Sequence, residues 1–207
     1  MTPNGRPESK RYDAEYFQRW YHDPARRVIA PAAVARKVHL AMGVAEMLLD
    51  RPIKRVLDVG CGEGAWRAHL RRARATVEYD GVESSEYAVA RYGRSRNIRA
   101  GSFGTLGALA LEGSYDLIVV CDVLQYIPDR ELASGLAAIA ALLGGVVYLE
   151  AYTTDDALDG DHAEWHHRSP EQYRRAFRRA GLHAVGMHCY VGEALLGATV
   201  TLERGHP

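Results

Sequence analysis

The chain has 207 residues, of which 47% are hydrophobic and 25% charged, and its 26 basic side chains balance its 26 acidic ones. Such a chain is typical of one globular domain with a small appendage and not of a disordered protein. The balanced charge gives no bulk attraction to nucleic acid or to an anionic membrane. The polar start has no signal-peptide core, and no apolar run approaches the roughly 20 residues that span a bilayer, so we expect a cytoplasmic protein.

The cysteines, Cys61, Cys121 and Cys189, lie far apart in the chain and form no CxxC pair. This spacing argues against a disulfide framework and against a zinc site. A redox role is therefore not expected.

Two periodicities alternate along the chain. Apolar residues at three- and four-residue spacing predict a helix over residues 31–50. A later helix is expected to begin at Asp129, as its N-cap, and to end at a glycine pair. A third begins at a capping box formed by Ser169 and Gln172. Short apolar runs predict strands between the helices, at residues 54–60, 76–83, 97–103, 115–122 and 145–152.

Strands that alternate with helices of this length imply βαβ units. Their right-handed crossovers give a parallel sheet with helices on both faces, so the fold class is α/β, with three layers. The C-terminal end differs, because residues 182–191 and 194–204 read as two strands joined by a short turn at Gly192 and Glu193. Strands that close together pair antiparallel, so we expect seven strands ending in an antiparallel hairpin.

The first strand is followed by a glycine-rich turn. Asp58 is followed by glycines at alternate positions, Gly60, Gly62 and Gly64. Glycine permits a tight turn and lets a ligand lie against the backbone, and a following helix directs free N–H groups at that ligand. Asp58 places a carboxylate where a cationic amino group could be received. Any tight strand-to-helix turn also favours glycine, so the motif alone does not establish a ligand site.

A second acidic residue strengthens the ligand interpretation. Glu83 ends the second predicted strand, close to the ~20-residue separation at which an acidic side chain accepts ribose hydroxyls. A solvated strand end would also account for Glu83 by itself. Together, the turn and Glu83 favour a nucleoside cofactor.

These motifs occur in a recognisable order. DVGCGEGA, GVESSEYAVARY, a GSF turn, YDLIVVCDVLQYIPD and LLGGVVYLE follow one another between residues 52 and 204. In this order the chain closely resembles the class I S-adenosylmethionine-dependent methyltransferases. The resemblance implies a Rossmann-like fold, S-adenosylmethionine as cofactor and methyl transfer to an N, O or C atom of a small molecule.

The resemblance also implies roles for individual residues. The strand end and turn, with Cys61 included, border the methionine portion of the cofactor, and Glu83 accepts the ribose hydroxyls with Ser84 beneath the adenosine. Many members have an aspartate that contacts adenine at the turn after the third strand, where this chain has Ser102 with Phe103 beside it. The Ser102 hydroxyl can still bond the adenine edge. Cys121 and Asp122 end the fourth strand beside the sulfonium. The residues carried over as cofactor-binding are thus Asp58, Gly60, Cys61, Gly62, Gly64, Glu83, Ser84, Ser102, Phe103, Cys121 and Asp122.

A segment with little periodicity follows the fifth strand, over residues 152–168. A loop of this length inside a domain is usually functional or mobile. It supplies the candidate catalytic residues Tyr152, His166 and His167, since histidine titrates near the pH at which a base would act. Its carboxylates and histidines could ligate a metal, but no metal-binding motif is apparent, and we expect no metal.

The first thirty residues are dense in aromatic side chains. Tyr12, Tyr16 and Trp20 share one face at helical spacing, which packs on the core or on a partner. The alternative is a lid over the cofactor, with a tyrosine or Arg27 near its carboxylate. We therefore divide the chain into a helical cap, residues 1–30, and a cofactor-binding methyltransferase domain, residues 31–207.

Other functions compete with this one. The glycine-rich turn also satisfies GxGxxA, which is typical of NAD(P)-dependent oxidoreductases, but little chain remains for a second substrate domain. A noncatalytic module that binds S-adenosylmethionine or another nucleoside is the other alternative. The arginine-rich helix faces read as solvated surface, and the amine-methylation motif of nucleic-acid enzymes is absent at the fourth strand. The expected partner is a small-molecule acceptor, without nucleic acid or membrane, and the chain is a monomer or a homodimer.

Overall fold

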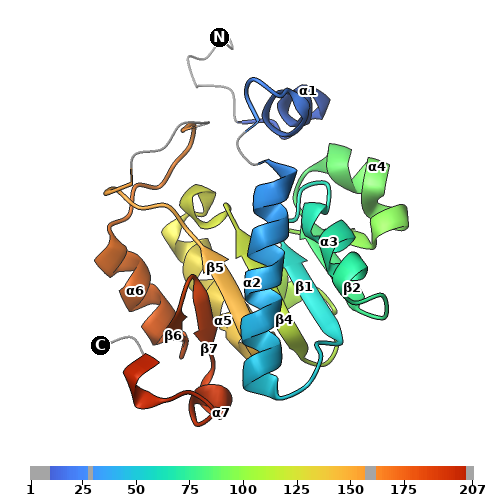
Figure 1. Ribbon diagram of the computed structural model, residues 1–207. Helices are drawn as coiled ribbons and strands as arrows, with labels where there is room; N and C mark the ends of the chain where they lie inside the picture. Colours follow the sequence, from blue (N-terminus) through green and yellow to red (C-terminus); the bar gives the residue numbers. More distant parts are fainter. Residues whose placement is uncertain (1–9, 28–29, 157–161, 204–207) are drawn as a thin grey trace.

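A single seven-stranded sheet organises the computed structural model, which describes residues 10–27, 30–156 and 162–203. The strand order is β3-β2-β1-β4-β5-β7-β6, and helices cover both faces of the sheet (Figure 1). The predicted α/β class with three layers is confirmed.

Five neighbouring strands run parallel. They are β1 (Arg55–Val59), β2 (Glu78–Glu83), β3 (Ile98–Ala100), β4 (Tyr115–Cys121) and β5 (Leu143–Glu150). The chain order reverses between β1 and β4, because β2 and β3 lie on one side of β1 while β4 and β5 lie on the other. In open α/β sheets, ligands bind beyond the carboxyl ends of the strands at such a switch point.

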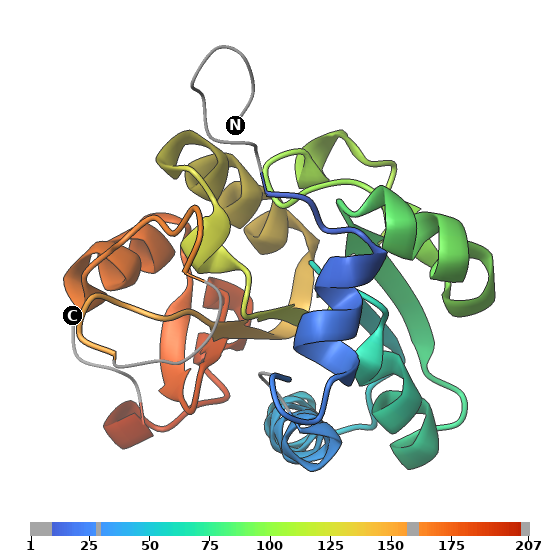
Figure 2. The same ribbon diagram turned by 90° about the horizontal axis from the view of Figure 1, so that it is seen from above.

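Two apolar clusters hold the layers together. On one face, α2 and α3 bury Val38, Met42 and Leu70 against the sheet, and on the other α5 and α6 bury Ile139 and Phe177 (Figure 2). No described helix is long and apolar enough to cross a membrane. The helices are α1 (Ala14–Phe17), which continues into a π-helical turn (Gln18–His22), α2 (Pro31–Leu49), α3 (Ala65–Ala73), α4 (Glu86–Arg96), α5 (Asp129–Leu142), α6 (Pro170–Arg179) and α7 (Glu193–Leu196).

Of the two predicted helix starts after Pro128, one is confirmed and one is wrong. The Ser169 hydroxyl and the Gln172 side chain form the expected reciprocal capping box at α6. Asp129 is not a cap: Pro128 is the N-cap of α5, and the Asp129 carboxylate accepts hydrogen bonds from Arg168 instead. The glycine pair does not end α5 either, because it lies inside β5. A Cβ on Gly145 would be 2.0 Å from the Asp116 carbonyl oxygen, so glycine here permits close strand contact.

The antiparallel hairpin exists, but its predicted position is wrong. Both strands, β6 (His183–Gly186) and β7 (Cys189–Val191), lie within the first of the two predicted ones. The turn between them is made by Met187 and His188, which adopt positive φ without being glycine. The described part of the second predicted strand, residues 194–203, holds most of α7 and a 3₁₀ turn (Thr201–Glu203) instead.

Two helical glycines provide a test of packing. An alanine at Gly135 of α5 would place its Cβ 2.2 Å from the Phe103 ring, whereas an alanine at Gly43 of α2 would meet nothing within 4 Å. We expect Gly135→Ala to lower the free energy of unfolding by about 1–3 kcal/mol through overpacking. Gly43→Ala should raise it by about 1 kcal/mol through helix propensity. Urea denaturation measures both, and equal effects would contradict the packing described for Phe103.

Candidate functional site

A cavity of about 580 Å³ opens beyond the carboxyl ends of β1, β2 and β4. This volume lies within the range of small-molecule sites. Its walls come from the turn after β1, the end of β2, the segment after β4, helix α2 and the loop after β5, and residues from the N-terminal segment cover it. The switch point of the sheet and the cavity thus coincide.

The turn after β1 is held directly against the end of β2. The Gly60 N–H donates to the Val82 carbonyl oxygen at 2.8 Å, and the Gly62 N–H donates to Glu83 Oε2 at 2.7 Å. Gly62 has φ +54°, and a Cβ on it would be 3.0 Å from the Tyr21 hydroxyl. Glycine is therefore required here both by the backbone conformation and by the side chain lying over the turn.

Glu83 is buried, with 7% of its surface exposed, and lines the cavity. Its second oxygen, Oε1, accepts the Ser85 N–H at 2.8 Å and the Ser84 hydroxyl at 3.3 Å. A carboxylate offers about four lone-pair sites, so one acceptor position remains for a ligand. A fixed, desolvated carboxylate of this kind suits the hydroxyls of a ribose.

Asp58 lies beneath the turn, and 2% of its surface is exposed. The Tyr79 hydroxyl donates to Asp58 Oδ2 at 2.8 Å. Burial raises the pKa of Asp58 to about 7; the Tyr79 hydrogen bond lowers it in part, and the nearby charge of Glu83 raises it. A cationic group entering the cavity would stabilise the ionised form.

The end of β4 supplies a second acidic group. Asp122 and Cys121 line the cavity, and Asp122 has φ +60°. Burial raises the pKa of Asp122 to about 6, although its hydrogen bond from Gln125 lowers it in part. Burial likewise raises the pKa of the Cys121 thiol, which keeps it neutral.

Most of the predicted site residues meet at the cavity. Those that line it are Asp58, Gly60, Cys61, Gly62, Glu83, Ser84, Cys121, Asp122 and Tyr152.

The other predicted residues are not among the described residues that line the cavity. Gly64 forms the left-handed N-cap of α3. The Ser102 hydroxyl lies 3.1 Å from that of Thr105 in a local turn, and Phe103 packs in the core against α5. His166 and His167 are exposed. The loop carboxylates Asp159 and Asp161 lie outside the described residues.

Sequence reasoning missed a half-buried ion pair at the cavity wall. Lys37 of α2 lines the cavity, and its ammonium lies 2.5 Å from Glu150 Oε1 at the end of β5. Two sequence signals could have found it. Lys37 is a cation beside Val34 and Val38 on the apolar stripe of its helix, and Glu150 closes an apolar strand as Glu83 does.

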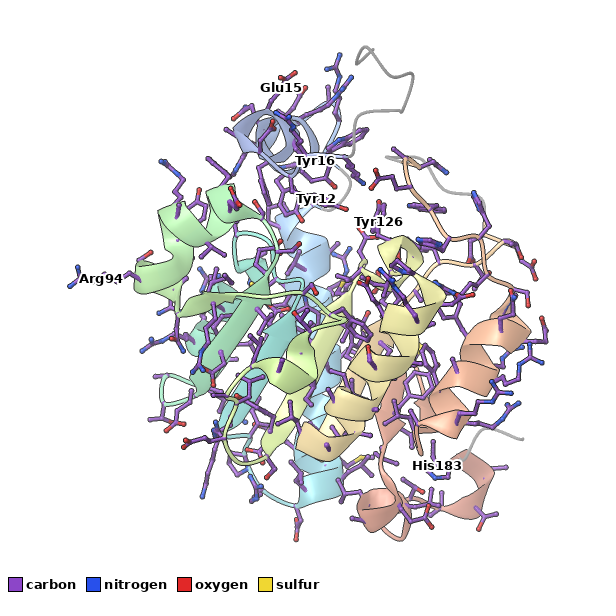
Figure 3. All side chains as sticks on the ribbon, turned by 180° about the vertical axis from the view of Figure 1, so that it is seen from behind. Tyr12, Glu15, Tyr16, Arg94, Tyr126 and His183 are labelled. Atoms are coloured by element: carbon purple, nitrogen blue, oxygen red, sulfur yellow. The ribbon has the colours of Figure 1, made fainter. Side chains whose placement is uncertain are left out.

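The N-terminal segment covers the cavity through several contacts. Phe17 is buried, and the Ser85 hydroxyl donates to the Tyr12 carbonyl oxygen at 2.5 Å. Tyr12 and Tyr16 line the cavity together with Tyr126, and Figure 3 shows the three at one end of the molecule. The Lys10 ammonium lies 3.8 Å from the centroid of the Tyr126 ring, which joins this segment to the opposite wall.

The chain is similar in sequence to a methyltransferase family and to two proteins named as methyltransferases. A methyltransferase domain model matches residues 14–185. The ubiquinone biosynthesis O-methyltransferase of Bordetella avium (strain 197N) is 27% identical over 159 residues, which cover 65% of this chain and 64% of the relative. The protein of the same name from Ralstonia nicotianae (strain ATCC BAA-1114 / GMI1000) is 35% identical over 104 residues, covering 46% and 42%. The chain thus matches less than two thirds of the length of either relative.

Solved structures share the fold at low sequence identity. DesVI of Streptomyces venezuelae superposes with a TM-score of 0.60 at 17% identity, covering 78% of this chain and 91% of that one. Magnesium protoporphyrin IX methyltransferase (ChlM) of Synechocystis PCC 6803, solved with bound SAH, gives 0.56 at 19% identity, covering 84% and 87%. The family match extends from α1 into β6, and the chain therefore belongs to the methyltransferase domain family.

Proposed function

We propose that this chain is an S-adenosylmethionine-dependent methyltransferase that acts on an N, O or C atom of a small-molecule acceptor. The observation that carries the proposal is the Glu83 carboxylate, which is buried at the cavity and fixed by the Gly62 N–H at 2.7 Å. The family membership supports the reaction class.

The residues around the cavity fit this cofactor in charge and shape. Glu83 would accept the ribose hydroxyls, Asp58 would receive the amino group, and the glycine turn would lie along the methionine portion. When bound, S-adenosylmethionine supplies a methyl group already activated on its sulfonium. The chain's own residues then have to hold the cofactor, orient the acceptor and exclude water. The roles predicted for Ser102 and Phe103 at the adenine stay predictions.

The N-terminal segment acts, in this proposal, as a lid, with residues 1–30 as the cap and 31–207 as the cofactor-binding domain. Support comes from the described residues of the segment. The Tyr21 hydroxyl lies over Gly62, and His22 Nε2 lies 3.0 Å from Glu63 Oε1. These contacts link the cap to the turn that would hold the cofactor, so closing the cap would exclude water from it.

The acceptor would enter on the side of Tyr126, Tyr152 and Trp165, which line the cavity. Of the three candidate catalytic residues, Tyr152 has its side chain at this wall. A role of His166 or His167 as a base stays a prediction, as do the cytoplasmic location and the monomeric or dimeric state.

Calorimetric titration with S-adenosylmethionine, its demethylated product and NAD, coupled to a methyl-transfer assay, tests the proposed function. We expect the first two compounds to bind and NAD not to bind. Binding of NAD would favour an oxidoreductase. Cofactor binding without turnover over a broad acceptor panel would favour a noncatalytic module.

Glu83→Gln should weaken binding of the demethylated cofactor about tenfold to 100-fold, since a hydrogen bond to a charged group contributes about 1.5–3 kcal/mol. Calorimetry measures the change. Glu78→Gln, at the exposed start of the same strand, is the matched control and should leave the affinity unchanged. Equal affinities of wild type and Glu83→Gln would contradict the nucleoside cradle.

Cofactor affinity should rise with pH. With its pKa raised to about 7, Asp58 is mostly protonated in the free protein near pH 6 and mostly ionised near pH 8. A cationic amino group binds the ionised form, so the association constant of the demethylated cofactor should increase about tenfold over this interval, with proton release. Calorimetry in buffers of different ionisation enthalpy measures both quantities. Asp58→Asn should abolish this pH dependence, and an unchanged profile in that variant would assign it to another group.

A further inference from the structure

We propose that the ammonium of Lys37 binds an anionic oxygen of the acceptor, so that the enzyme selects a planar acceptor with an acidic hydroxyl group, such as a phenol. The inference rests on the proposed function, because it assigns the acceptor side of the same cavity. It concerns the ion pair between Lys37 within α2 and Glu150 at the end of β5, which the cofactor contacts described above do not use.

Lys37 is held in place by a buried carboxylate. Glu150 is 4% exposed, and its Oε1 lies 2.5 Å from Lys37 Nζ. The same ammonium lies 3.7 Å from Cys121 Sγ, at the end of β4. The Lys37 side chain is 21% exposed and lines the cavity. The ammonium is therefore held by Glu150 and is accessible from the cavity. Among the described residues, Glu150 and Cys121 are the two hydrogen-bond partners of the ammonium, so a third N–H group remains for an acceptor oxygen.

Glu150 is placed to anchor the Lys37 ammonium and not to take a proton from the acceptor. The Tyr148 hydroxyl donates to its Oε2 at 2.5 Å, and the Tyr152 hydroxyl donates to its Oε1 at 3.1 Å. Glu150 is not among the described residues that line the cavity. Its three donors engage both oxygens, which leaves Lys37 and Tyr152 as the polar groups that this cluster presents to the cavity.

The charge of Lys37 persists at neutral pH. Burial lowers its pKa, but the hydrogen bond and the charge of Glu150 raise it, and the net pKa lies above the usual value. The groups that face the pair are Asp122, Cys121, Tyr148 and Tyr152, together with His188, which acts on Glu150. Burial raises the pKa of the Cys121 thiol and of the two phenols, so they stay neutral here.

Aromatic rings line the same cavity as the Lys37 ammonium. The planes of Tyr152 and Trp165 are within 8° of parallel, with centroids 6.3 Å apart, and Tyr126 meets Trp165 edge-on at 6.3 Å. Flat rings favour a planar ligand, because aromatic pairs stack or meet edge to face. A cation beside such walls selects a planar molecule that carries a negative oxygen.

Methyl transfer to the acceptor oxygen balances when Lys37 binds that oxygen as an anion. A cation within about 4 Å lowers the pKa of a hydroxyl, so the acceptor releases its proton to water on binding. The bound oxygen then forms the new O–C bond to the methyl group, while the S–C bond breaks and its electron pair remains on sulfur. Lys37 stabilises the oxyanion and is not consumed.

The probe for the test is 4-nitrocatechol, whose visible absorption reports its ionisation. It is titrated over pH with the protein saturated by the demethylated cofactor. We expect the bound probe to ionise at least about one pH unit lower than the free probe, as an opposite charge at short range produces. Lys37→Met should return the midpoint to that of the free probe.

Two further variants keep the test independent of folding. Lys37→Met combined with Glu150→Gln removes both charges, so no buried carboxylate is left unpaired, and it should abolish the shift as well. Arg36→Met removes a neighbouring exposed cation on the same helix and should leave the shift intact. Circular dichroism confirms that each variant is folded.

Binding of the demethylated cofactor and of methylthioadenosine, which lacks the carboxylate, is measured for every variant. Failure of the wild-type protein to bind the cofactor would contradict the proposed function. Two results would overturn only the present inference. One is that the cofactor binds but 4-nitrocatechol does not. The other is that the shift in the ionisation midpoint of the bound probe survives in both Lys37 variants. Loss of cofactor affinity in Lys37→Met, with methylthioadenosine unaffected, would assign the ammonium to the cofactor's carboxylate and would also overturn it.

Discussion

The hydrogen bond from the Gly62 N–H to Glu83 is the interaction on which the rest of the site depends. It joins the turn after β1 to the end of β2, two segments brought together because these strands are parallel neighbours with Val59 opposite Val82. The carboxylate is desolvated by this arrangement and oriented by backbone donors, so it is fixed before any ligand arrives. Asp58 and the glycine turn take their positions from the same strand pairing.

Glu150 is a second buried carboxylate at a strand end, on the other side of the centre of the sheet from Glu83. Glu150 ends β5, whereas Glu83 ends β2, and β1 and β4 lie between these strands. Glu83 is held by N–H groups and lines the cavity, while Glu150 is covered and holds Lys37, which lines the cavity in its place. The end of β2 thus places a carboxylate at the cavity, and the end of β5 places an ammonium there.

Local sequence patterns predicted most helices and strands correctly, but they predicted the positions of the turns between them less well. The first five strands, the helix over residues 31–50 and the capping box at Ser169 depend on residues a few positions apart, and these were confirmed. The hairpin was misplaced because its turn uses Met187 and His188 at positive φ, which residue preference does not indicate. The ring of Phe103 packs against Gly135, a contact between distant segments that no local pattern indicates, and its place at the adenine stays a prediction.

The sequence by itself determined that this is an α/β chain with a glycine-rich turn and an acidic strand end at nucleoside-binding spacing. These features are local, since periodicity, caps and short spacings act within one or two elements. The tertiary structure alone decided which side chains share the cavity. Lys37 and Glu150 are 113 positions apart, and their contact exists because α2 packs against β4 and β5. Pairing over such a distance follows from how the layers close around one core, which no spacing along the chain encodes.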